Sequence, residues 1–417
     1  MQLHENRTET EKALLVSVDT GEFDAETSID ELEELAHTAG ADVLGKLIQR
    51  RERIEAATFV GYGKLAEIIF FCENNDVDLL IFDSELTPSQ QRNLEKLTNV
   101  RVIDRTMLIL DIFAARARTS EGKLQVELAQ LKYSLPRLMG QGQQLSRLGG
   151  GIGTRGPGET KLESDRRHIR RRIQKLEEEL RQLEKRRAML RNRREKDGVI
   201  SVAIVGYTNA GKSTLMNALT DAGVLTENKL FATLDPTSRA LILPDGRQVM
   251  LVDTVGLIRR LPHKLVEAFK STLEEAATAT VILNVCDAAD EHASEHLEVT
   301  KKLLEELGCE GKPIISVMNK CDKVGDLYAM PTFRGTVMIS ALEQKGLDNL
   351  LQAICDALPQ TVREVKLLIP FQNGGDAARL REDGVVLEEE YRPDGLYMHV
   401  RAEGRLLDPM QSWIIPD

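Results

Sequence analysis

Several features are missing from this sequence, and each absence narrows what the protein can be. No apolar run approaches the roughly 18 residues that a membrane-spanning helix needs, and the polar first segment, MQLHENRTETEK, is no signal peptide. The five cysteines are scattered without a CxxC pair, which fits a reducing compartment better than a disulfide framework and offers no metal-ligand set. Aromatic residues make up only 4%, which argues against a protein that reads single-stranded nucleic acid by base stacking. We therefore expect a cytoplasmic protein without a membrane span.

The stretch GYTNAGKST, at 206–214, fits the phosphate-binding pattern GxxxxGK[ST]. A predicted strand at 200–205 leads into it, and a predicted helix at 213–222 follows with its positive end toward the phosphates. The glycines let backbone N–H groups wrap a polyphosphate, the lysine reaches the β and γ phosphates, and the serine hydroxyl binds Mg²⁺. The predicted nucleotide contacts of this loop are Gly206, Tyr207, Thr208, Asn209, Ala210, Gly211, Lys212, Ser213 and Thr214.

Further motifs follow in the order that a GTPase needs. DTVG ends a predicted strand at 249–252, which places Asp253 to hold Mg²⁺ through water and the Gly256 N–H to sense the γ-phosphate. NKCD ends the predicted strand 314–318, where Asp322 accepts hydrogen bonds from guanine N1 and N2. Adenine lacks this donor pair, so the site can reject it by about 10⁴. The other predicted contacts are Thr254, Val255, Asn319, which ties its loop to the phosphate loop, Lys320, and the guanine-O6 loop Ser340, Ala341 and Leu342.

The segment FATLDPT, at 231–237, is the candidate switch between these motifs. We expect Phe231 and Ala232 to contact the nucleotide and Thr233 to close on Mg²⁺ and the γ-phosphate, with Thr237 as the alternative for that role. The predicted catalytic residues are then Lys212, Thr233 and Gly256, and the predicted Mg²⁺ ligands are Ser213, Thr233 and Asp253.

Two details of the motifs predict kinetic behaviour. Leu257 follows the DTVG turn, where many regulatory GTPases carry a Gln that orients water. An aliphatic side chain cannot orient water, so we expect slow intrinsic turnover, on the order of 10⁻⁴ to 10⁻² per second, and acceleration by a partner. Asn209 can supply an oxygen to a K⁺ ion that bridges the phosphates, or it can simply satisfy a nearby backbone group. The first alternative predicts faster hydrolysis in K⁺ than in Na⁺.

The rest of the chain predicts an α/β protein with three parts around a P-loop GTPase domain. Strands and helices alternate up to residue 118, which indicates a small α/β domain. Its turn at 58–64 is either a tight strand-to-helix connection or a second phosphate contact. The C-terminal pattern indicates a small α+β domain. The expected domains are 1–118, a helical hairpin at 119–197 with its tip loop at 140–158, the GTPase domain at 198–360 and the C-terminal domain at 361–417.

The hairpin is predicted from two leucine-rich seams with steps of four and three residues. The first seam runs from Leu124 to Leu138, and the second from Ile169 to Leu190 with Arg187 at its one polar position. From 165 to 197 the chain carries fourteen Lys and Arg against seven Asp and Glu, a net charge of +7 in a protein of net charge −11. This basic arm is either a contact surface for nucleic-acid backbone or a solvated coiled-coil face.

The loop between the seams is far longer than the roughly 2 to 8 residues that close most helical hairpins. It contains six glycines between Gly149 and Gly158, together with Arg147 and Arg155, and no acidic residue. Glycine lets backbone approach a ligand closely and arginine recognises phosphate, so we favour an RNA-contacting loop over a disordered linker.

One motif stands apart from these predictions. The stretch HASEH, at 292–296, fits the HxxEH pattern of zinc proteases. It lies in the predicted helix between the Mg²⁺-binding and base-reading strands, where we expect a solvated face. We therefore predict no zinc site there.

The chain resembles the HflX family of ribosome-associated GTPases over essentially its whole length. The resemblance is carried by GGGIGTRGPGETKLE at 149–163, EGKLQVELAQLKYSLPRL at 121–138, FATLDPT and DTVGLI. It implies a monomeric GTPase that binds GTP and GDP with Mg²⁺, docks on the large ribosomal subunit through 119–197 and splits stalled or idle ribosomes under stress. Two alternatives remain, a GTPase of ribosome assembly or RNA modification, and a signalling GTPase that binds a protein effector.

Overall fold

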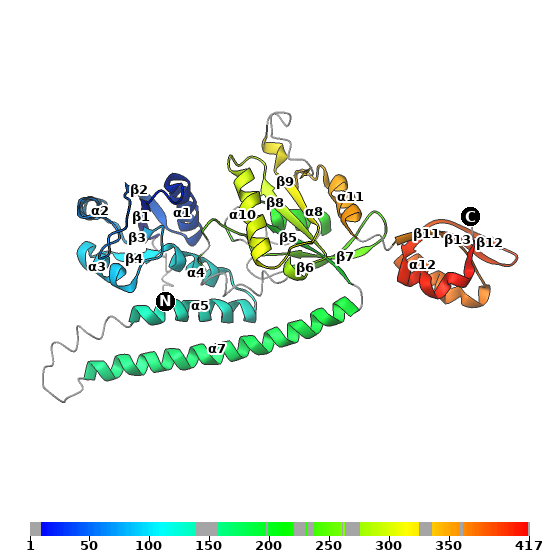
Figure 1. Ribbon diagram of the computed structural model, residues 1–417, viewed down its shortest axis with the longest axis horizontal. Helices are drawn as coiled ribbons and strands as arrows, with labels where there is room; N and C mark the ends of the chain where they lie inside the picture. The colour runs from blue at the N-terminus through cyan, green and yellow to red at the C-terminus, as the bar shows by residue number, and fades with distance from the viewer. Residues whose placement is uncertain are drawn as a thin grey trace, which may run out of the picture. The chain divides into compact units, whose positions relative to one another are not determined.

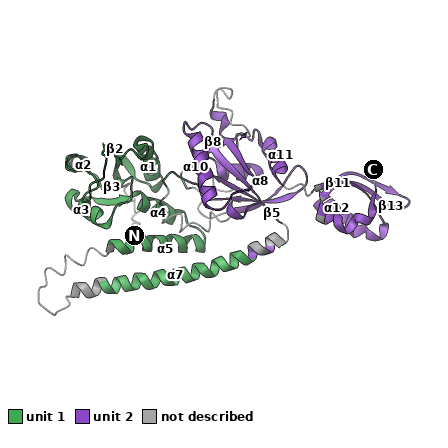
Figure 2. Cartoon of the chain, viewed as in Figure 1, with its two compact units in different colours: residues 1–189, 227–235, 258–271 green, residues 190–226, 236–257, 272–417 purple. Residues whose placement is uncertain are grey.

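The computed structural model describes residues 10–138, 157–196, 199–220, 230–231, 237–260, 262, 276–324, 336–358 and 362–415. The chain divides into two compact units, coloured in Figure 2. Unit 1 comprises residues 1–189, 227–235 and 258–271, and unit 2 comprises residues 190–226, 236–257 and 272–417. Two short segments from the middle of the chain therefore belong to unit 1, although their sequence neighbours belong to unit 2.

Unit 1 contains a four-stranded parallel sheet in the order β2-β1-β3-β4, with helices connecting its strands (Figure 1). Its core consists of apolar side chains such as Leu14, Val16 and Phe82 from the strands and Ile68 and Leu94 from the helices, which confirms the predicted alternation. The elements are β1 (Lys12–Asp19), α1 (Ala25–Ala39), β2 (Asp42–Arg50), α2 (Tyr62–Asn75), β3 (Leu79–Phe82), α3 (Pro88–Thr98), β4 (Arg101–Asp104) and α4 (Arg105–Arg116).

Side-chain caps set where these helices begin. Asp24 accepts the backbone N–H groups of Glu26 and Thr27 at the start of α1, and Thr87 forms a capping box with Gln90 in α3. Each such cap stabilises a helix by about 1 kcal/mol. The strand order reverses between β1 and β3, and in such sheets the carboxyl ends of the two strands flank a crevice. Here that crevice receives polar side chains, as described below.

The predicted helical hairpin consists of α5 (Ser120–Leu138) and α7 (Pro157–Lys196), which lie side by side in Figure 1. Arg187, the polar residue of the second seam, forms an ion pair with Glu121 of α5. Lys132 pairs with Glu177 at 2.7 Å, so ion pairs as well as leucines join the two antiparallel helices.

Two details of the predicted hairpin were wrong. Helix α7 begins at Pro157, one residue before the expected end of the loop at 158, because Pro is favoured in the first turn of a helix. Leu190 is 54% exposed and takes no part in the seam. Helix α5 also has a second buried face that the leucine pattern did not predict. Its residues are Gly122, Val126, Ala129 and Tyr133.

Unit 2 contains a six-stranded sheet in the order β10-β9-β8-β5-β7-β6, parallel except for β6. Buried apolar side chains cover both faces, with Leu215 and Ile354 on one and Leu257 and Leu304 on the other. Burial of one leucine contributes about 1.5–3 kcal/mol. The elements are β5 (Ile200–Gly206), α8 (Lys212–Thr220), β6 (Thr237–Ile242), β7 (Gln248–Asp253), β8 (Val281–Asp287), α10 (Ala293–Glu306), β9 (Ile314–Asn319), β10 (Thr336–Met338) and α11 (Leu347–Ala357).

The C-terminal part is an antiparallel sheet in the order β12-β13-β11-β14 with its own apolar core, which confirms the predicted α+β pattern. Its elements are β11 (Val362–Ile369), α12 (Gly374–Asp383), β12 (Val385–Arg392), β13 (Gly395–Glu403), α13 (Gly404–Leu407) and β14 (Ile414–Ile415). Within the described parts of the chain, every helix is too short or too polar to span a bilayer.

Candidate nucleotide-binding site

The phosphate loop connects the carboxyl end of β5 to α8 through two glycines that no other residue can replace. Gly206 has a φ of 151°, and a Cβ atom there would lie 2.0 Å from the Val285 carbonyl oxygen. Gly211 has a φ of 86°, and its Cβ would lie 2.3 Å from Asn319 Nδ2. The loop therefore runs in direct contact with β8 and with the NKCD loop, as the motif requires.

Lys212 lies almost entirely inside this loop, with 7% of its surface exposed. Its Nζ donates to the carbonyl oxygens of Gly206 at 3.1 Å and Tyr207 at 2.8 Å. Burial lowers the pKa of Lys212 to about 8; the nearby Asp253 opposes this shift and Lys320 adds to it. A buried cation beside the positive end of α8 is suited to a polyphosphate, whose negative charge would raise this pKa again.

Asp253 lies fully buried at the end of β7, beside the first turn of α8. Its Oδ2 accepts a hydrogen bond from Ser213 Oγ at 2.8 Å. A hydroxyl and a carboxylate in contact are the hard oxygen ligands that Mg²⁺ prefers, so two of the three predicted ligands fit that ion. The third, Thr233, lies outside the described residues together with Ala232. The alternative, Thr237, pairs with Asp253 across β6 and β7, and its hydroxyl donates to Met216 Sδ at 3.4 Å.

The DTVG turn is joined to the phosphate loop by two backbone hydrogen bonds. The Thr208 N–H donates to Leu257 O at 2.7 Å, and the Leu257 N–H donates to Gly206 O at 3.1 Å. A Cβ at Gly256 would lie 2.8 Å from Thr208 Cγ2, so this close approach requires glycine. Leu257 itself is 2% exposed and packs with Ala203 in the core, where it has no access to water.

The base-reading loops meet at Asn319. Its Nδ2 donates to Ala210 O at 2.9 Å, which confirms the predicted link to the phosphate loop, and its Oδ1 accepts the Ala341 N–H at 3.0 Å. Asp322 accepts a hydrogen bond from Ser340 Oγ at 2.5 Å, and this bond lowers the pKa of the Asp322 carboxyl. Asp322 therefore stays ionised near neutral pH, as an acceptor for two N–H donors must.

Phe231 and Arg259 belong to unit 1, and each contacts a residue of α4. The Phe231 ring is 2% exposed and packs edge-to-face against Phe113, with ring centroids 4.7 Å apart. Helix α4 therefore holds Phe231, the first residue of the candidate switch, in an apolar environment. The nucleotide contact of Phe231 stays a prediction, and its buried side chain anchors the segment.

The same helix begins with Arg105, which holds the segment after the DTVG turn. Arg105 donates to Arg259 O at 3.1 Å and to Asp83 Oδ1 at 2.9 Å, and it also pairs with Glu31. Arg260 donates to the other oxygen of the same carboxylate, Asp83 Oδ2, at 3.0 Å. Asp83 follows β3, at the carboxyl end of a strand where the strand order reverses, and Arg105 and Arg260 connect the segment after the DTVG turn to this carboxylate.

The sequence reasoning missed this cluster, although one signal was present. Arg105 is the first residue of a helix, where the helix dipole disfavours a cation unless carboxylates lie nearby. Asp83 and Arg260 are separated by 177 residues, and no local pattern connects them.

The remaining predictions concern the guanine-O6 loop, the tip loop, the turn at 58–64 and metal binding. Leu342 is 76% exposed beside the base-reading loops, and Arg147 and Arg155 lie outside the described residues. The Gly61–Lys64 turn is a strand-to-helix connection in which the Gly61 N–H donates to Gln49 Oε1 at 2.9 Å. In the described residues no group of three or more His, Cys, Asp or Glu side chains could hold a metal.

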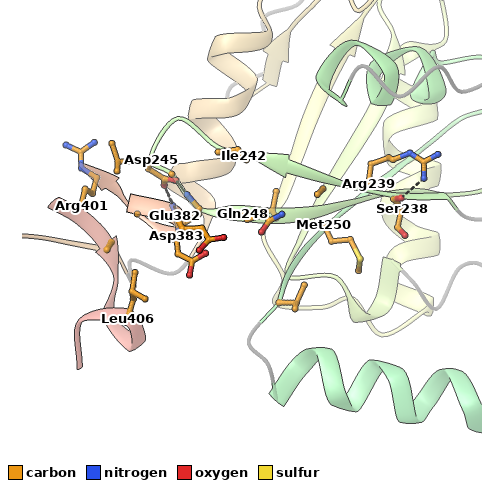
Figure 3. Close-up of a pocket in the computed structure, with 18 residues that line it drawn as sticks. Ser238, Arg239, Ile242, Asp245, Gln248, Met250, Glu382, Asp383, Arg401 and Leu406 are labelled. Carbon is orange, nitrogen blue, oxygen red and sulfur yellow. Dashed lines mark hydrogen bonds and ion pairs between the residues drawn. The ribbon is translucent and has the colours of Figure 1, made fainter. Parts of the chain in front are cut away.

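A separate cavity lies beside β6, β7 and the C-terminal elements (Figure 3). Asp245, Glu382 and Asp383 bring carboxylates to it, and the predicted nucleotide contacts are not among its lining residues. Arg239, Arg247 and Arg401 line the same cavity, so the formal charges of its side chains balance.

A phosphate loop, a DxxG turn and an NKxD loop at the carboxyl edge of one sheet define the class of the protein as a P-loop GTPase. Three family models match the chain in succession: GTP-binding GTPase N-terminal at residues 26–114, GTP-binding GTPase Middle Region at 116–194 and 50S ribosome-binding GTPase at 201–320.

Full-length relatives agree with these models. GTPase HflX of Caldanaerobacter subterraneus is 51% identical over 99% of this chain and 96% of its own, and GTPase HflX of Escherichia coli K12 is 43% identical over 92% of each. A solved GTP-binding protein from Sulfolobus solfataricus in complex with GDP is 28% identical over 84% of this chain and 98% of its own, with a TM-score of 0.43. The chain belongs to the GTPase HflX family.

Proposed function

We propose that this GTPase is a cytoplasmic, monomeric switch that docks on the large ribosomal subunit in its GTP form and splits stalled or idle ribosomes under stress. Binding separates the subunits, and hydrolysis of GTP to GDP and phosphate releases the factor. The match to the 50S ribosome-binding GTPase model supports the partner, and the names of the relatives support the enzyme class.

The nucleotide chemistry rests on the contacts described above. Lys212 and the Gly256 N–H would stabilise the charge that develops on the γ-phosphate, and Thr233 would close over it. Ser213, Asp253 and Thr233 would hold Mg²⁺, which neutralises phosphate charge when it is bound. Asn209 remains the proposed K⁺ ligand. Because Leu257 is buried, the group that orients the attacking water must come from elsewhere, and a ribosomal partner meets that need.

The main structural support for the proposed binding to the ribosome is an arginine stripe on α7. Six residues at helical spacing line one groove along this helix, so their side chains share one face. Arg167, Arg170 and Arg171 are exposed in this stripe. The residues of the stripe are Glu163, Arg166, Arg167, Arg170, Arg171 and Gln174.

Basic residues on the opposite side of the same helix have a different role. Arg172 donates two hydrogen bonds to Glu127 of α5, each 2.6 Å long, and Arg187 pairs with Glu121. These cations hold the hairpin together, whereas Arg167, Arg170 and Arg171 of the stripe are exposed to solvent. A row of exposed arginines matches the spacing and charge of an RNA phosphate backbone. We propose that the stripe and the tip-loop residues Arg147 and Arg155 contact ribosomal RNA.

The test compares the stripe with a charge-matched control. Arg167, Arg170 and Arg171 are replaced together by Gln, and binding to purified large subunits is measured by sedimentation with a non-hydrolysable GTP analogue over a range of salt. We expect weaker binding and a salt slope reduced by about 0.7–0.9 for each lost phosphate contact. Replacement of Lys301, Lys302 and Arg379, which are exposed elsewhere, should leave both quantities unchanged.

Subunit splitting is tested in the same samples by light scattering of intact ribosomes. The wild-type protein with the analogue should split them without hydrolysis. Preference for immature particles would support a role in ribosome assembly instead, and equal binding by the stripe variant would support a protein effector.

A further inference from the structure

The second histidine of the HASEH stretch contacts the phosphate loop. The ring of His296, in α10, stacks on the ring of Tyr207, with centroids 3.7 Å apart and an interplanar angle of 9°. Each of the two residues is only 7% exposed. The expectation of a solvated face was therefore wrong at this position, because α10 packs against the end of β5, where Tyr207 begins the loop.

Polar contacts fix the orientation of the histidine ring. His296 Nδ1 lies 3.4 Å from Asp290 Oδ2, and its backbone carbonyl accepts Thr300 Oγ1 at 2.9 Å. The carboxylate beside Nδ1 favours a hydrogen on that nitrogen and turns the flat face of the imidazole toward Tyr207. The Nδ1 of His292, one turn earlier, lies 3.9 Å from Glu295 Oε1.

Tyr207 connects three parts of the phosphate site, which are Lys212, the phosphate loop and the DTVG turn. Its carbonyl oxygen accepts Lys212 Nζ at 2.8 Å and the Ala210 N–H at 3.3 Å. The peptide groups on either side of it form the two hydrogen bonds that join the loop to Leu257. A rotation of the Tyr207 side chain and backbone would therefore displace the lysine, the loop and the DTVG turn together.

We infer that His296 is a positioning residue for GTP binding and hydrolysis, which holds the phosphate loop in its binding conformation by stacking on Tyr207. The histidine touches neither phosphate nor Mg²⁺ and acts only through the tyrosine. This inference rests on the proposed role of the phosphate loop and does not depend on ribosome splitting.

The test measures dissociation of a fluorescent GDP analogue by stopped flow, together with the KM and kcat of GTP hydrolysis. His296→Ala should speed dissociation and raise KM by about 2- to 10-fold, the range expected for loss of one aromatic pair. His296→Phe, which keeps a flat ring, should restore values close to those of the wild type. Tyr207→Ala should have the same effect as His296→Ala, and the double variant should add nothing further.

Two controls separate positioning from helix stability. Thr300→Ala removes a hydrogen bond to the same residue without touching the ring, and His292→Ala removes the neighbouring histidine; neither should change nucleotide dissociation. If Thr300→Ala reproduced the effect of His296→Ala at an equal loss of Tm, or if His296→Phe were as impaired as the alanine variant, the inference would be wrong. Failure of the wild-type protein to bind GDP would instead overturn the proposed nucleotide site.

Discussion

The two halves of the nucleotide site are supported by different parts of the molecule. The phosphate loop and the base-reading loops are built into the sheet of unit 2, where Asn319, Asp253 and Lys212 bond to neighbouring strands and loops. Described residues next to the switch motifs, Phe231 and Arg260, are held instead by side chains of unit 1. The loops predicted to recognise the nucleotide therefore belong to unit 2, whereas the described residues next to the switch motifs belong to unit 1. Substitutions in the two groups of residues should therefore separate GDP affinity from the free energy of unfolding.

The largest expected effect is on base specificity. Asp322→Asn replaces one acceptor oxygen by an NH₂ donor that faces the guanine donors, so the preference for GTP should fall by about 10⁴. Xanthosine triphosphate carries a carbonyl oxygen where guanine has its amino group and should be used instead. Competition between the two nucleotides measures this. Asp356→Asn, an exposed control, should keep the preference for GTP, and an unchanged preference in Asp322→Asn would remove this residue from the base site.

The next largest effect concerns Lys212. Lys212→Ala should lower kcat/KM by about 10²–10³, as loss of a preorganised cation does. Lys301→Ala, an exposed lysine, serves as the control.

Lys212 also predicts a pH dependence of GDP affinity. The pKa of this lysine is about 8 without nucleotide, and bound phosphates raise it. Affinity should therefore be constant below pH 8 and fall above it, by at most about tenfold per pH unit, as the free protein loses the proton. The Lys212→Arg variant stays charged over this pH range, so its GDP affinity should not fall above pH 8. All other titrating groups are the same in the two proteins. Identical profiles for the two proteins would contradict the assignment.

A smaller effect is expected in the cluster at Asp83. Arg260→Ala removes one of the two arginines from a buried carboxylate and should lower the free energy of unfolding by about 1–3 kcal/mol. GDP affinity should change little, because the phosphate loop is held by other contacts. Urea unfolding and GDP titration measure the two quantities. Arg239→Ala is the control, because the Arg239 guanidinium donates to Ser238 O in β6, far from Asp83 in the sequence and in a different sheet from β3. A large loss of GDP affinity in Arg260→Ala would contradict the expected separation of affinity from stability.

The smallest effect is expected at the aromatic pair. Phe113→Leu keeps an apolar side chain but loses the edge-to-face contact with Phe231, which should cost about 1 kcal/mol of stability. Phe70→Leu, at a position that is 69% exposed, should cost less. If thermal unfolding showed the same loss of stability in the two variants, the edge-to-face contact between Phe113 and Phe231 would not contribute to stability.

The sequence predicted those parts of the fold and site that depend on local pattern. Leu14 and Phe82 lie in buried strands because apolar runs bounded by turn residues form such strands. The Asn319 hydrogen bond to Ala210 followed from the order of two motifs, since the carboxyl ends of parallel strands share one edge of a sheet. The leucine seams predicted the hairpin but not the second buried face of α5, where Gly122 and Ala129 carry little hydrophobic signal.

The sequence by itself determined the class of the protein, the family, the chemistry of the phosphate and base loops and the basic character of α7. The tertiary structure alone decided which arginines of α7 pair with α5 and which face solvent. It also decided that Asp83 receives Arg260 and that His296 lies on Tyr207. These contacts join residues far apart in the chain, and their partners are selected by packing geometry, which local periodicity and motif spacing do not encode.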